Sequence, residues 1–141
     1  MIRTCAACGQ LNRVPARHLA KRGKCGACKA ELPPLGEPVE ADRALFDEVV
    51  EGAQVPVFVD FWATWCGPCR MVAPEVQKLA TRFAGKALVL KVDTDKEGEV
   101  AGRFGIQSIP TFMVFKDGKP VVRESGARSE LGLAKLVEQA A

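Results

Sequence analysis

The sequence predicts an α/β protein with a mixed central sheet, helices on both faces of that sheet, and a small cysteine-rich module in front of it. Four of the six cysteines fall within the first 28 residues, and a proline-rich segment follows them. The rest of the chain alternates short apolar runs with segments of helical period. A strand, a helix and a second strand, followed by a hairpin and a helix, build a mixed sheet covered on both faces. With 141 residues, the chain fits one ordinary domain and a small appendage.

Two pairs of cysteines in the first module have the spacing of a zinc site. Cys5, Cys8, Cys25 and Cys28 form the pattern C-x2-C-x16-C-x2-C, and four thiolates suit a closed tetrahedral site. The segment is too short to fold on an apolar core alone, so a bound metal ion would supply much of its folding free energy. Two alternatives stay open. The cysteines could form two dithiols without metal, or they could bind iron, which tetrahedral sulfur ligands also accept.

Basic residues dominate this module. Residues 1–36 carry seven Lys and Arg against one acid, Glu31, whereas residues 37–141 carry 13 Lys and Arg against 16 acids. We interpret the excess as a solvated surface that offsets the negative charge of a zinc tetrathiolate. The alternative is a nucleic-acid-binding ribbon. We disfavour it because residues 1–45 contain no aromatic side chain on which a base could stack.

The elements of the second part each carry a local signal. Residues 33–38 indicate a stiff, proline-rich linker. Asp42 is suited to cap a first helix, and the β-branched, aromatic run 55–61 predicts a buried strand. Apolar residues then recur at i, i+4, i+7 and i+11 along residues 67–84, which indicates a helix with one buried face.

The last third of the chain predicts a further strand, a short helix, a hairpin and a final helix. Asp117-Gly118 is a strong signal for the hairpin turn because both residues tolerate a positive φ. Ser129 can cap the final helix. The expected bounds are 87–92 for the strand, Gly105 as the end of the short helix, and 112–115 and 121–124 for the two strands of the hairpin.

The remaining two cysteines lie at the junction between the strand at 55–61 and the helix that follows it. Cys66 and Cys69 are separated by Gly67 and Pro68, at the start of that helix. Unpaired N–H groups and the helix dipole favour a thiolate there, and the thiolate is the form of cysteine that attacks disulfides. We therefore expect Cys66 to be the more exposed, activated thiol and Cys69 to be the buried thiol that closes a small ring.

Trp-Cys-Gly-Pro-Cys at residues 65–69, after such a strand, resembles the active site of the thioredoxin family. The resemblance spans residues 37–141. With the zinc module at 1–36, the whole chain resembles the zinc-carrying bacterial thioredoxins of the second type. This implies a thioredoxin fold preceded by a zinc-ribbon-like module with one structural or regulatory zinc ion. It further implies a protein-disulfide reductase that acts on disulfide-containing proteins by dithiol–disulfide exchange and is recycled by an NADPH-dependent thioredoxin reductase.

Asp60 is an acid in the middle of an apolar strand. If its carboxyl is buried without a partner, burial raises its pKa. The alternative is an acid on the outer face of a half-exposed strand. By the resemblance, Asp60 is the buried acid beneath the second cysteine and accepts the proton of Cys69. Lys91 matches the lysine that the family has near this acid, although the residues alone also allow a snorkelling charge at a strand edge.

The resemblance also implies a shallow apolar groove beside the dithiol, where target proteins bind. Ile109-Pro110 matches a loop of the family whose Xaa–Pro bond is cis. Thr94 and Ser125 depart from the pattern, because the best-known thioredoxins have apolar residues at these positions. The groove residues carried over are Trp65, Gly67, Pro68, Ile109, Pro110, Gly126 and Ala127.

The sequence predicts a cytoplasmic protein without a membrane partner. No run approaches the roughly 18 apolar residues of a membrane span, and the first residues lack the apolar region of a secretory signal. In a reducing compartment, paired cysteines indicate metal or redox work. Two other functional classes stay open. One is a zinc-dependent redox sensor or holdase that releases zinc on mild oxidation, and the other is a nucleic-acid-binding module with strongly salt-dependent binding.

Overall fold

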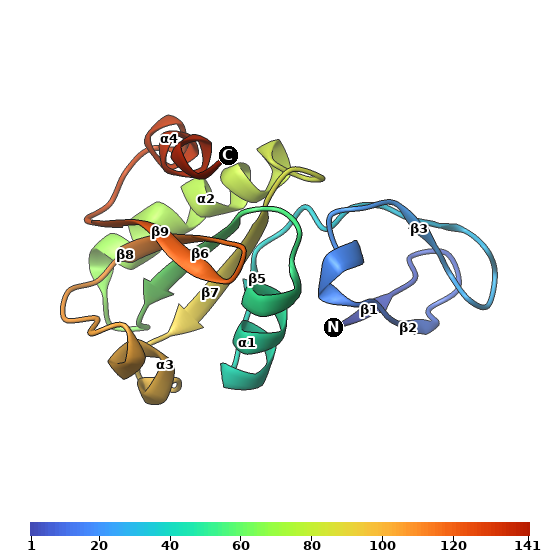
Figure 1. Cartoon of the computed structure of the whole chain (residues 1–141), viewed down its shortest axis with the longest axis horizontal. Helices are drawn as coiled ribbons and strands as arrows, with labels where there is room; N and C mark the ends of the chain where they lie inside the picture. Colours follow the sequence, from blue (N-terminus) through green and yellow to red (C-terminus); the bar gives the residue numbers. More distant parts are fainter.

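The computed structural model describes residues 1–141 as a five-stranded sheet with helices on both faces and two small hairpins beside it (Figure 1). The hairpins come first in the chain and lie at the right of Figure 1, next to helix α1 (Arg43–Gly52). The sheet and the other helices lie at the left. None of the helices combines the length and the apolar content that crossing a bilayer requires.

Two antiparallel hairpins build the cysteine-rich module. Strand β1 (Ile2–Thr4) pairs with β2 (Leu11–Arg13), and β3 (Gly23–Lys24) pairs with β4 (Glu31–Leu32). The short 3-10 helix η1 (Ala16–His18) connects the two hairpins. Each hairpin turn holds one pair of cysteines, so the two pairs occupy matching positions in the module.

The five-stranded sheet is mixed, as expected, with the strand order β5-β7-β6-β8-β9. Its strands are β5 (Val39–Glu40), β6 (Val57–Trp62), β7 (Leu88–Asp93), β8 (Thr111–Lys116) and β9 (Lys119–Ser125). The first three strands of that order are parallel, whereas β8 and β9 are antiparallel to their neighbours. The turn between β8 and β9 has a positive φ at both Asp117 and Gly118, which confirms the hairpin prediction.

The helices cover the two faces of the sheet in pairs. Besides α1, they are α2 (Gly67–Arg82), α3 (Gly98–Arg103) and α4 (Glu130–Ala140). Buried side chains of α1 and α3 form one apolar cluster with the sheet, and those of α2 and α4 form another. The side chains of Asp42 and Ser129 accept backbone N–H groups in the first turns of α1 and α4, so both predicted caps are confirmed.

Strand β6 is buried on both faces. Residues 57–61 are each at most 1 % exposed, because β7 and β8 flank the strand and helices cover it above and below. Val59 faces the cluster of α1, and Phe58 faces the cluster of α2. The alternation of a strand then puts Asp60 on the same face as Phe58. An apolar run with an acid inside it is therefore held at the centre of the fold.

The cysteine-rich module shares an apolar core with the sheet. Leu19, just after η1, is fully buried in the cluster that contains Val49 of α1, together with Ala16 and Leu35. The approach is close, since a Cβ added at Gly52 would lie 2.9 Å from the Cβ of Ala16. The sequence did not predict this contact, because Leu19 belongs to no periodic apolar pattern.

Replacing Leu19 with alanine should lower the free energy of unfolding of the sheet by about 2–4 kcal/mol, because loss of a fully buried leucine leaves a cavity. Both tryptophans lie outside the module, so denaturant unfolding followed by their fluorescence reports on the sheet. Leu11→Ala is the matched control. Leu11 is 61 % exposed, and its loss should change the stability by less than about 0.5 kcal/mol. Equal midpoints for Leu19→Ala and the unchanged protein would show that module and sheet unfold independently.

Candidate active site and metal centre

The dithiol lies where β6 leads into α2. Cys66 is the N-cap of α2, and its Sγ accepts the backbone N–H of Cys69 at 3.2 Å. The two cysteines form a disulfide in this structure. When that bond is reduced, an N–H aimed at the sulfur from a helix N-terminus favours a negative charge on Cys66. The local structure therefore suits a thiolate at the first cysteine.

The disulfide form does not show the expected difference in exposure between Cys66 and Cys69. Cys66 and Cys69 are both 4 % exposed in this disulfide form. The bond turns the Cys66 sulfur toward Cys69, and Ile109 packs against the pair. The Cys66 Sγ lies 3.8 Å from the carbonyl oxygen of Ile109. In this form, the two sulfur atoms differ in their position at the helix N-terminus and not in their exposure.

The loop opposite the dithiol has the predicted conformation. The Ile109–Pro110 bond is cis, as expected. The Gly126 N–H donates to the carbonyl oxygen of Pro110 at 2.9 Å and so ties the end of β9 to this loop. Trp65 is 67 % exposed, and its indole N–H donates to a carboxylate oxygen of Asp95 at 2.9 Å. A large aromatic face is thus held at the surface next to Cys66.

A hollow beside the dithiol contains part of the expected groove. Trp65 and Ile109 line it, together with Thr94, Ala101 and Ile106. Ala101 and Ile106 were not among the groove residues expected from the sequence. The signal that could have found Ile106 is an apolar side chain in the polar loop just before Ile109. The other expected groove residues do not line this hollow: Gly67, Pro68, Pro110, Gly126 and Ala127.

The Asp60 side chain points into the protein. The residue is 1 % exposed, and neither carboxyl oxygen has a hydrogen-bond partner. Burial raises the pKa of Asp60 to about 7; the positive charge of Lys91 opposes this shift and the negative charge of Glu40 adds to it. The alternative of an outward-facing acid is wrong, because helices cover both faces of β6. Asp60 therefore changes its charge near neutral pH.

Lys91 lies beside Asp60 in the sheet, but its ion-pair partner is Glu40. The register pairs Lys91 of β7 with Asp60 of β6. The Lys91 Nζ makes an ion pair with Glu40 Oε1 at 3.8 Å and lies 4.6 Å from the centroid of the Trp62 ring. Glu40 also accepts the indole N–H of Trp62 at 3.3 Å. Sequence reasoning missed Glu40, because only the pairing of β5 with β7 brings it to this place.

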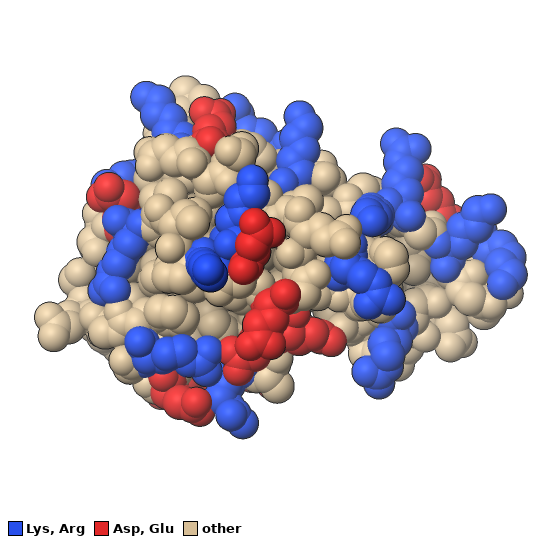
Figure 2. Space-filling view, viewed as in Figure 1, with Lys and Arg blue, Asp and Glu red and all other residues tan.

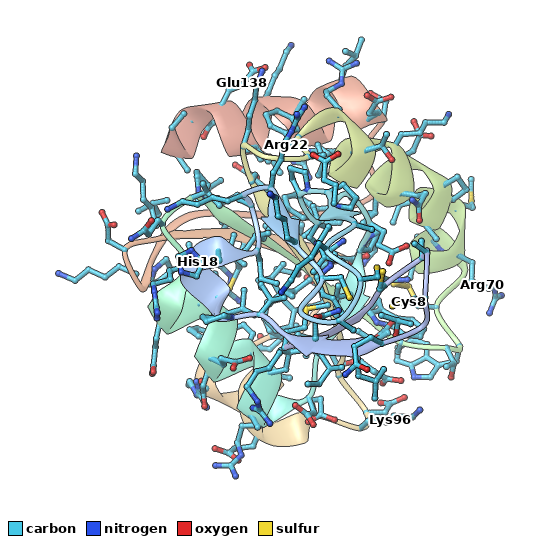
Figure 3. The ribbon with its side chains drawn as sticks, turned by 90° about the vertical axis from the view of Figure 1, so that its right-hand side faces the viewer. Cys8, His18, Arg22, Arg70, Lys96 and Glu138 are labelled. Carbon is cyan, nitrogen blue, oxygen red and sulfur yellow. A yellow bond between two sulfur atoms is a disulfide. The ribbon has the colours of Figure 1, made fainter.

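The four N-terminal cysteines form a cluster that fits a tetrahedral metal ion. Their sulfur atoms all lie within 4.8 Å of one another, with 3.6 Å between Cys5 and Cys28 and 3.7 Å between Cys8 and Cys25. A zinc ion with Zn–S bonds of about 2.3 Å requires sulfur separations of about 3.8 Å. Figure 3, which looks onto the module, shows Cys8 at this cluster and His18 well away from it. The cluster therefore needs no histidine ligand.

The two hairpin turns hold the cluster in matching ways. The Gly9 N–H donates to the Cys5 carbonyl oxygen at 2.9 Å, and the Lys29 N–H donates to the Cys25 carbonyl oxygen at 3.0 Å. Gly9 and Lys29 both have a positive φ, which is uncommon for lysine. The Asn12 amide and the Ala27 N–H lie 3.6 Å and 3.4 Å from the Cys25 sulfur. Donors of this kind stabilise the charge of a metal-bound thiolate.

The surface around the cluster is basic. Figure 2 shows Lys and Arg side chains gathered over the module at the right of the molecule. Glu31 is the only acid among them and pairs with Arg22 at 3.4 Å. These side chains surround a site that four thiolates would make negative.

Comparison with known proteins covers both parts of the chain. The profile of the family described as Thioredoxin matches residues 37–139. The chain belongs to the thioredoxin family. A second profile, described as Thioredoxin 2, N-terminal, and named as a zinc ribbon, matches residues 4–30. The dithiol and the cysteine cluster thus fall in separate regions of a zinc-ribbon thioredoxin sequence.

Relatives of known name agree with this assignment. Thioredoxin C-3 of Corynebacterium nephridii is 37 % identical over 139 residues, which cover 99 % of this chain and 94 % of that protein. Thioredoxin 1 of a Nostoc species is 49 % identical over 105 residues, or 74 % of this chain and 98 % of that protein. The structure of a mutant thioredoxin from Halobacterium salinarum is 35 % identical. It has a TM-score of 0.68 and covers 73 % of this chain and 89 % of that one.

As a member of the thioredoxin family, this protein is a disulfide-reducing oxidoreductase that works by dithiol–disulfide exchange at Cys66 and Cys69. Its substrates are disulfide-bonded proteins, and its recycling partner is a thioredoxin reductase. Its N-terminal ribbon provides a four-cysteine site for one zinc ion. The predicted fold, activity and cofactor are confirmed.

We expect the purified thioredoxin-family protein to carry one zinc ion per chain, since its sulfur cluster has tetrahedral dimensions. Cys25→Ser should lose the ion, because a hydroxyl is a poor substitute for a thiolate ligand and Cys25 is fully buried. Elemental analysis of the dialysed protein measures the metal content. The control is the double variant Cys66→Ser and Cys69→Ser, which should keep its zinc. Iron in the protein, or zinc loss in the control, would contradict the assignment.

Proposed function

We propose that this chain is a cytoplasmic protein-disulfide reductase with Cys66 as nucleophile and Cys69 as resolving thiol, recycled by an NADPH-dependent thioredoxin reductase. The observation that carries the proposal is the place of the Cys66 sulfur at the N-terminus of α2, 3.2 Å from the Cys69 N–H. That donor and the helix dipole stabilise the attacking thiolate. A reducing compartment keeps both the dithiol and a zinc tetrathiolate in their working forms, which supports a cytoplasmic location.

The reaction transfers two electrons from the Cys66–Cys69 dithiol to the substrate disulfide. The Cys66 thiolate attacks one sulfur of the substrate disulfide, and the other substrate sulfur leaves as a thiolate. Cys69 then gives up its proton, and its thiolate attacks the Cys66 sulfur of the mixed disulfide. The second substrate sulfur leaves as a thiolate. The protein ends as the Cys66–Cys69 disulfide, the form seen in this structure, and the substrate ends with two thiols.

In this mechanism Asp60 accepts the proton of Cys69 before the second attack. A carboxyl with a pKa raised to about 7 by burial is about half ionised near neutral pH. A large fraction of the molecules therefore has an ionised Asp60 that can accept a proton, and this carboxylate is still basic enough to take one. General base catalysis favours a pKa near the operating pH for these two reasons. Lys91 is the neighbour of Asp60 across the β6–β7 pairing. Its positive charge lowers the pKa of Asp60 and so opposes the larger effect of burial.

The target protein docks on the surface around the dithiol in this proposal. Trp65 supports this role, because a large aromatic side chain that is mostly exposed offers apolar area to a partner. Ile109 lies against both Cys66 and the adjoining hollow. We assign the docking surface to Trp65, Gly67, Pro68, Ile109, Pro110, Gly126 and Ala127.

We further propose that residues 37–141 form the reductase domain and that residues 1–36 form the zinc module with its linker. The first range contains the dithiol, Asp60 and the whole docking surface. The second range contains the sulfur cluster. Leu19 packs against α1 rather than against the dithiol, so we assign the zinc module to stability rather than to the chemical steps.

Cys66→Ser should reduce the rate of insulin disulfide reduction to the uncatalysed background, since the nucleophile is gone. Cys69→Ser should instead trap a mixed disulfide between Cys66 and the substrate, because no thiol remains to resolve it. Mass spectrometry under non-reducing conditions detects the trapped species. Normal turnover of Cys69→Ser, or a trapped species in Cys66→Ser, would show that the two roles are assigned the wrong way round.

Asp60→Asn should remove a pH-dependent loss of stability. The raised pKa of about 7 means that folded Asp60 holds a proton that the unfolded chain has already lost above about pH 4. Stability of the unchanged protein therefore falls as pH rises from about 4 to about 7 and then levels off. The loss is about 4 kcal/mol from this group, and it is absent from the variant. Denaturant unfolding at pH 4 and pH 8 measures it.

The same variant should reduce disulfides about tenfold more slowly or worse, because Cys69 has lost its proton acceptor. Asp117→Asn is the matched control. It makes the same chemical change in the exposed β8–β9 turn, where asparagine tolerates the positive φ. The control should match the unchanged protein in both measurements. An Asp60→Asn protein with the original pH dependence, or with the original rate, would refute the role given to Asp60.

A further inference from the structure

Three charged side chains lie in one row across the sheet. The register pairs Glu40 of β5 with Lys91 of β7, and it pairs the same Lys91 with Asp60 of β6. Residues paired across neighbouring strands present their side chains on the same face. The row therefore runs from a carboxylate at the sheet edge, through a lysine, to a carboxyl at the sheet centre.

Burial increases steeply along this row. The Glu40 side chain is 54 % exposed and the Lys91 side chain is 21 % exposed, whereas Asp60 is 1 % exposed. A lysine between two acids has two possible partners. The inner acid is the more deeply buried, so an ion pair with it would cost more desolvation of the ammonium. The outer acid stays partly hydrated and offers a less costly partner.

The structure shows which partner the lysine has. The Lys91 Nζ lies 3.8 Å from Glu40 Oε1, while both oxygens of Asp60 lack a hydrogen-bond partner. Trp62 contacts both members of this ion pair. Its indole N–H donates to the second Glu40 oxygen at 3.3 Å, and the centroid of its ring lies 4.6 Å from the Lys91 Nζ. Glu40, Lys91 and Trp62 thus form a closed set of contacts, and the Asp60 carboxyl is not part of it.

We propose that Glu40 is a positioning residue for the resolving step: it holds the Lys91 ammonium in an ion pair at the sheet edge, so that the Asp60 carboxyl stays without an ion-pair partner and can receive the proton of Cys69. This inference rests on the proposed role of Asp60. It assigns to an edge-strand residue a task in a reaction that it does not touch.

The electrostatics agree with this role. Burial is the main cause of the raised pKa of Asp60, Lys91 opposes it, and Glu40 adds to it. If Glu40 lost its charge, two effects would act in the same direction. Its own repulsion of the Asp60 carboxylate would vanish, and the freed ammonium could pair with Asp60 instead. Each effect favours ionisation and lowers the pKa of Asp60.

Lys91 and Glu40 are the only charged groups that shift the pKa of Asp60, so no other charge hides the change that the loss of Glu40 would cause. From β8, the partner of Asp60 in the register is Phe112. The buried side chains of α2 and α4, which cover this face, are apolar apart from the Cys69 thiol. Asp93 of β7 and Lys96 act on Glu40, with opposite signs. Asp60 itself therefore experiences mainly Lys91 and Glu40.

Glu40→Gln tests the proposal with little change in shape. The glutamine oxygen can still accept the Trp62 indole N–H, but the charge that attracts Lys91 is gone. Carbon-13 NMR of the side-chain carboxyl follows the titration of Asp60 in the intact, zinc-loaded protein. We expect its midpoint to fall by about 0.5–1 pH unit in the variant. The pH profile of the resolving step, measured in single turnovers with a disulfide peptide, should shift to lower pH by the same amount.

Two further variants serve as controls for Glu40→Gln. Glu138→Gln removes one negative charge from an exposed position of α4 whose side chain makes no hydrogen bond or ion pair, and it should leave the midpoint and the profile unchanged. In the Asp60→Asn background, Glu40→Gln should no longer shift the profile, since the group on which it acts is missing. A shift that persists in that background would mean that Glu40 acts by another route.

The outcomes separate the two proposals. An unchanged or higher Asp60 midpoint in Glu40→Gln overturns the positioning role and leaves the proton-acceptor role of Asp60 intact. An unchanged resolving rate in the single variant Asp60→Asn overturns the proton-acceptor role of Asp60. It also overturns the positioning role of Glu40, because that role acts through Asp60. A lower midpoint, a shifted profile and no shift in the Asp60→Asn background together support the inference.

Discussion

The burial of β6 on both faces is the constraint on which the active site depends. The strand has hydrogen-bonded neighbours on either side and an apolar cluster above and below it. A segment packed in this way has one position, because interiors are close-packed and tolerate little displacement. The fixed end of the strand therefore fixes the position of the dithiol that follows it, with Cys66 as the N-cap of α2. The chemistry at Cys66 therefore depends on the packing of a strand that ends four residues earlier, at Trp62.

The same burial leaves the Asp60 carboxyl as the one buried polar side-chain group without a hydrogen-bond partner. An unpartnered carboxyl in a low dielectric raises the free energy of the folded state once it ionises. A sequence selected for stability alone would place an apolar residue at position 60. Features that break the rules of packing occur where function needs them, and the rest of the fold offsets their cost. Two apolar clusters with fully buried phenylalanine, leucine and valine side chains provide that offset here.

The sequence predicted what depends on local pattern and left open what depends on tertiary contact. The periodicity of 55–61 and 67–84 located β6 and α2 to within two residues, and the cysteine spacings located both sulfur sites. The place of Glu40 beside Lys91 was not predictable, because the register of β5 against β7 depends on parallel pairing between segments far apart in the chain. Leu19 was missed for a related reason. A single apolar residue after η1 has no period, and only the docking of the module on α1 reveals its partner.

The contact at Leu19 determines how the zinc module and the dithiol can influence each other. No hydrogen bond or ion pair joins residues 1–36 to the segment from Trp62 to Arg70, and Figure 1 shows the module beside α1 while β6 points away from it. No direct polar contact therefore links the zinc site to the dithiol in this structure. Stability offers an indirect link, because a ligand that binds only the folded module stabilises whatever unfolds together with it. Through Leu19, zinc binding is linked to the stability of the sheet that holds β6. On this physical basis, we expect zinc to act on the reductase by keeping its scaffold folded rather than by changing the reactivity of its sulfur atoms.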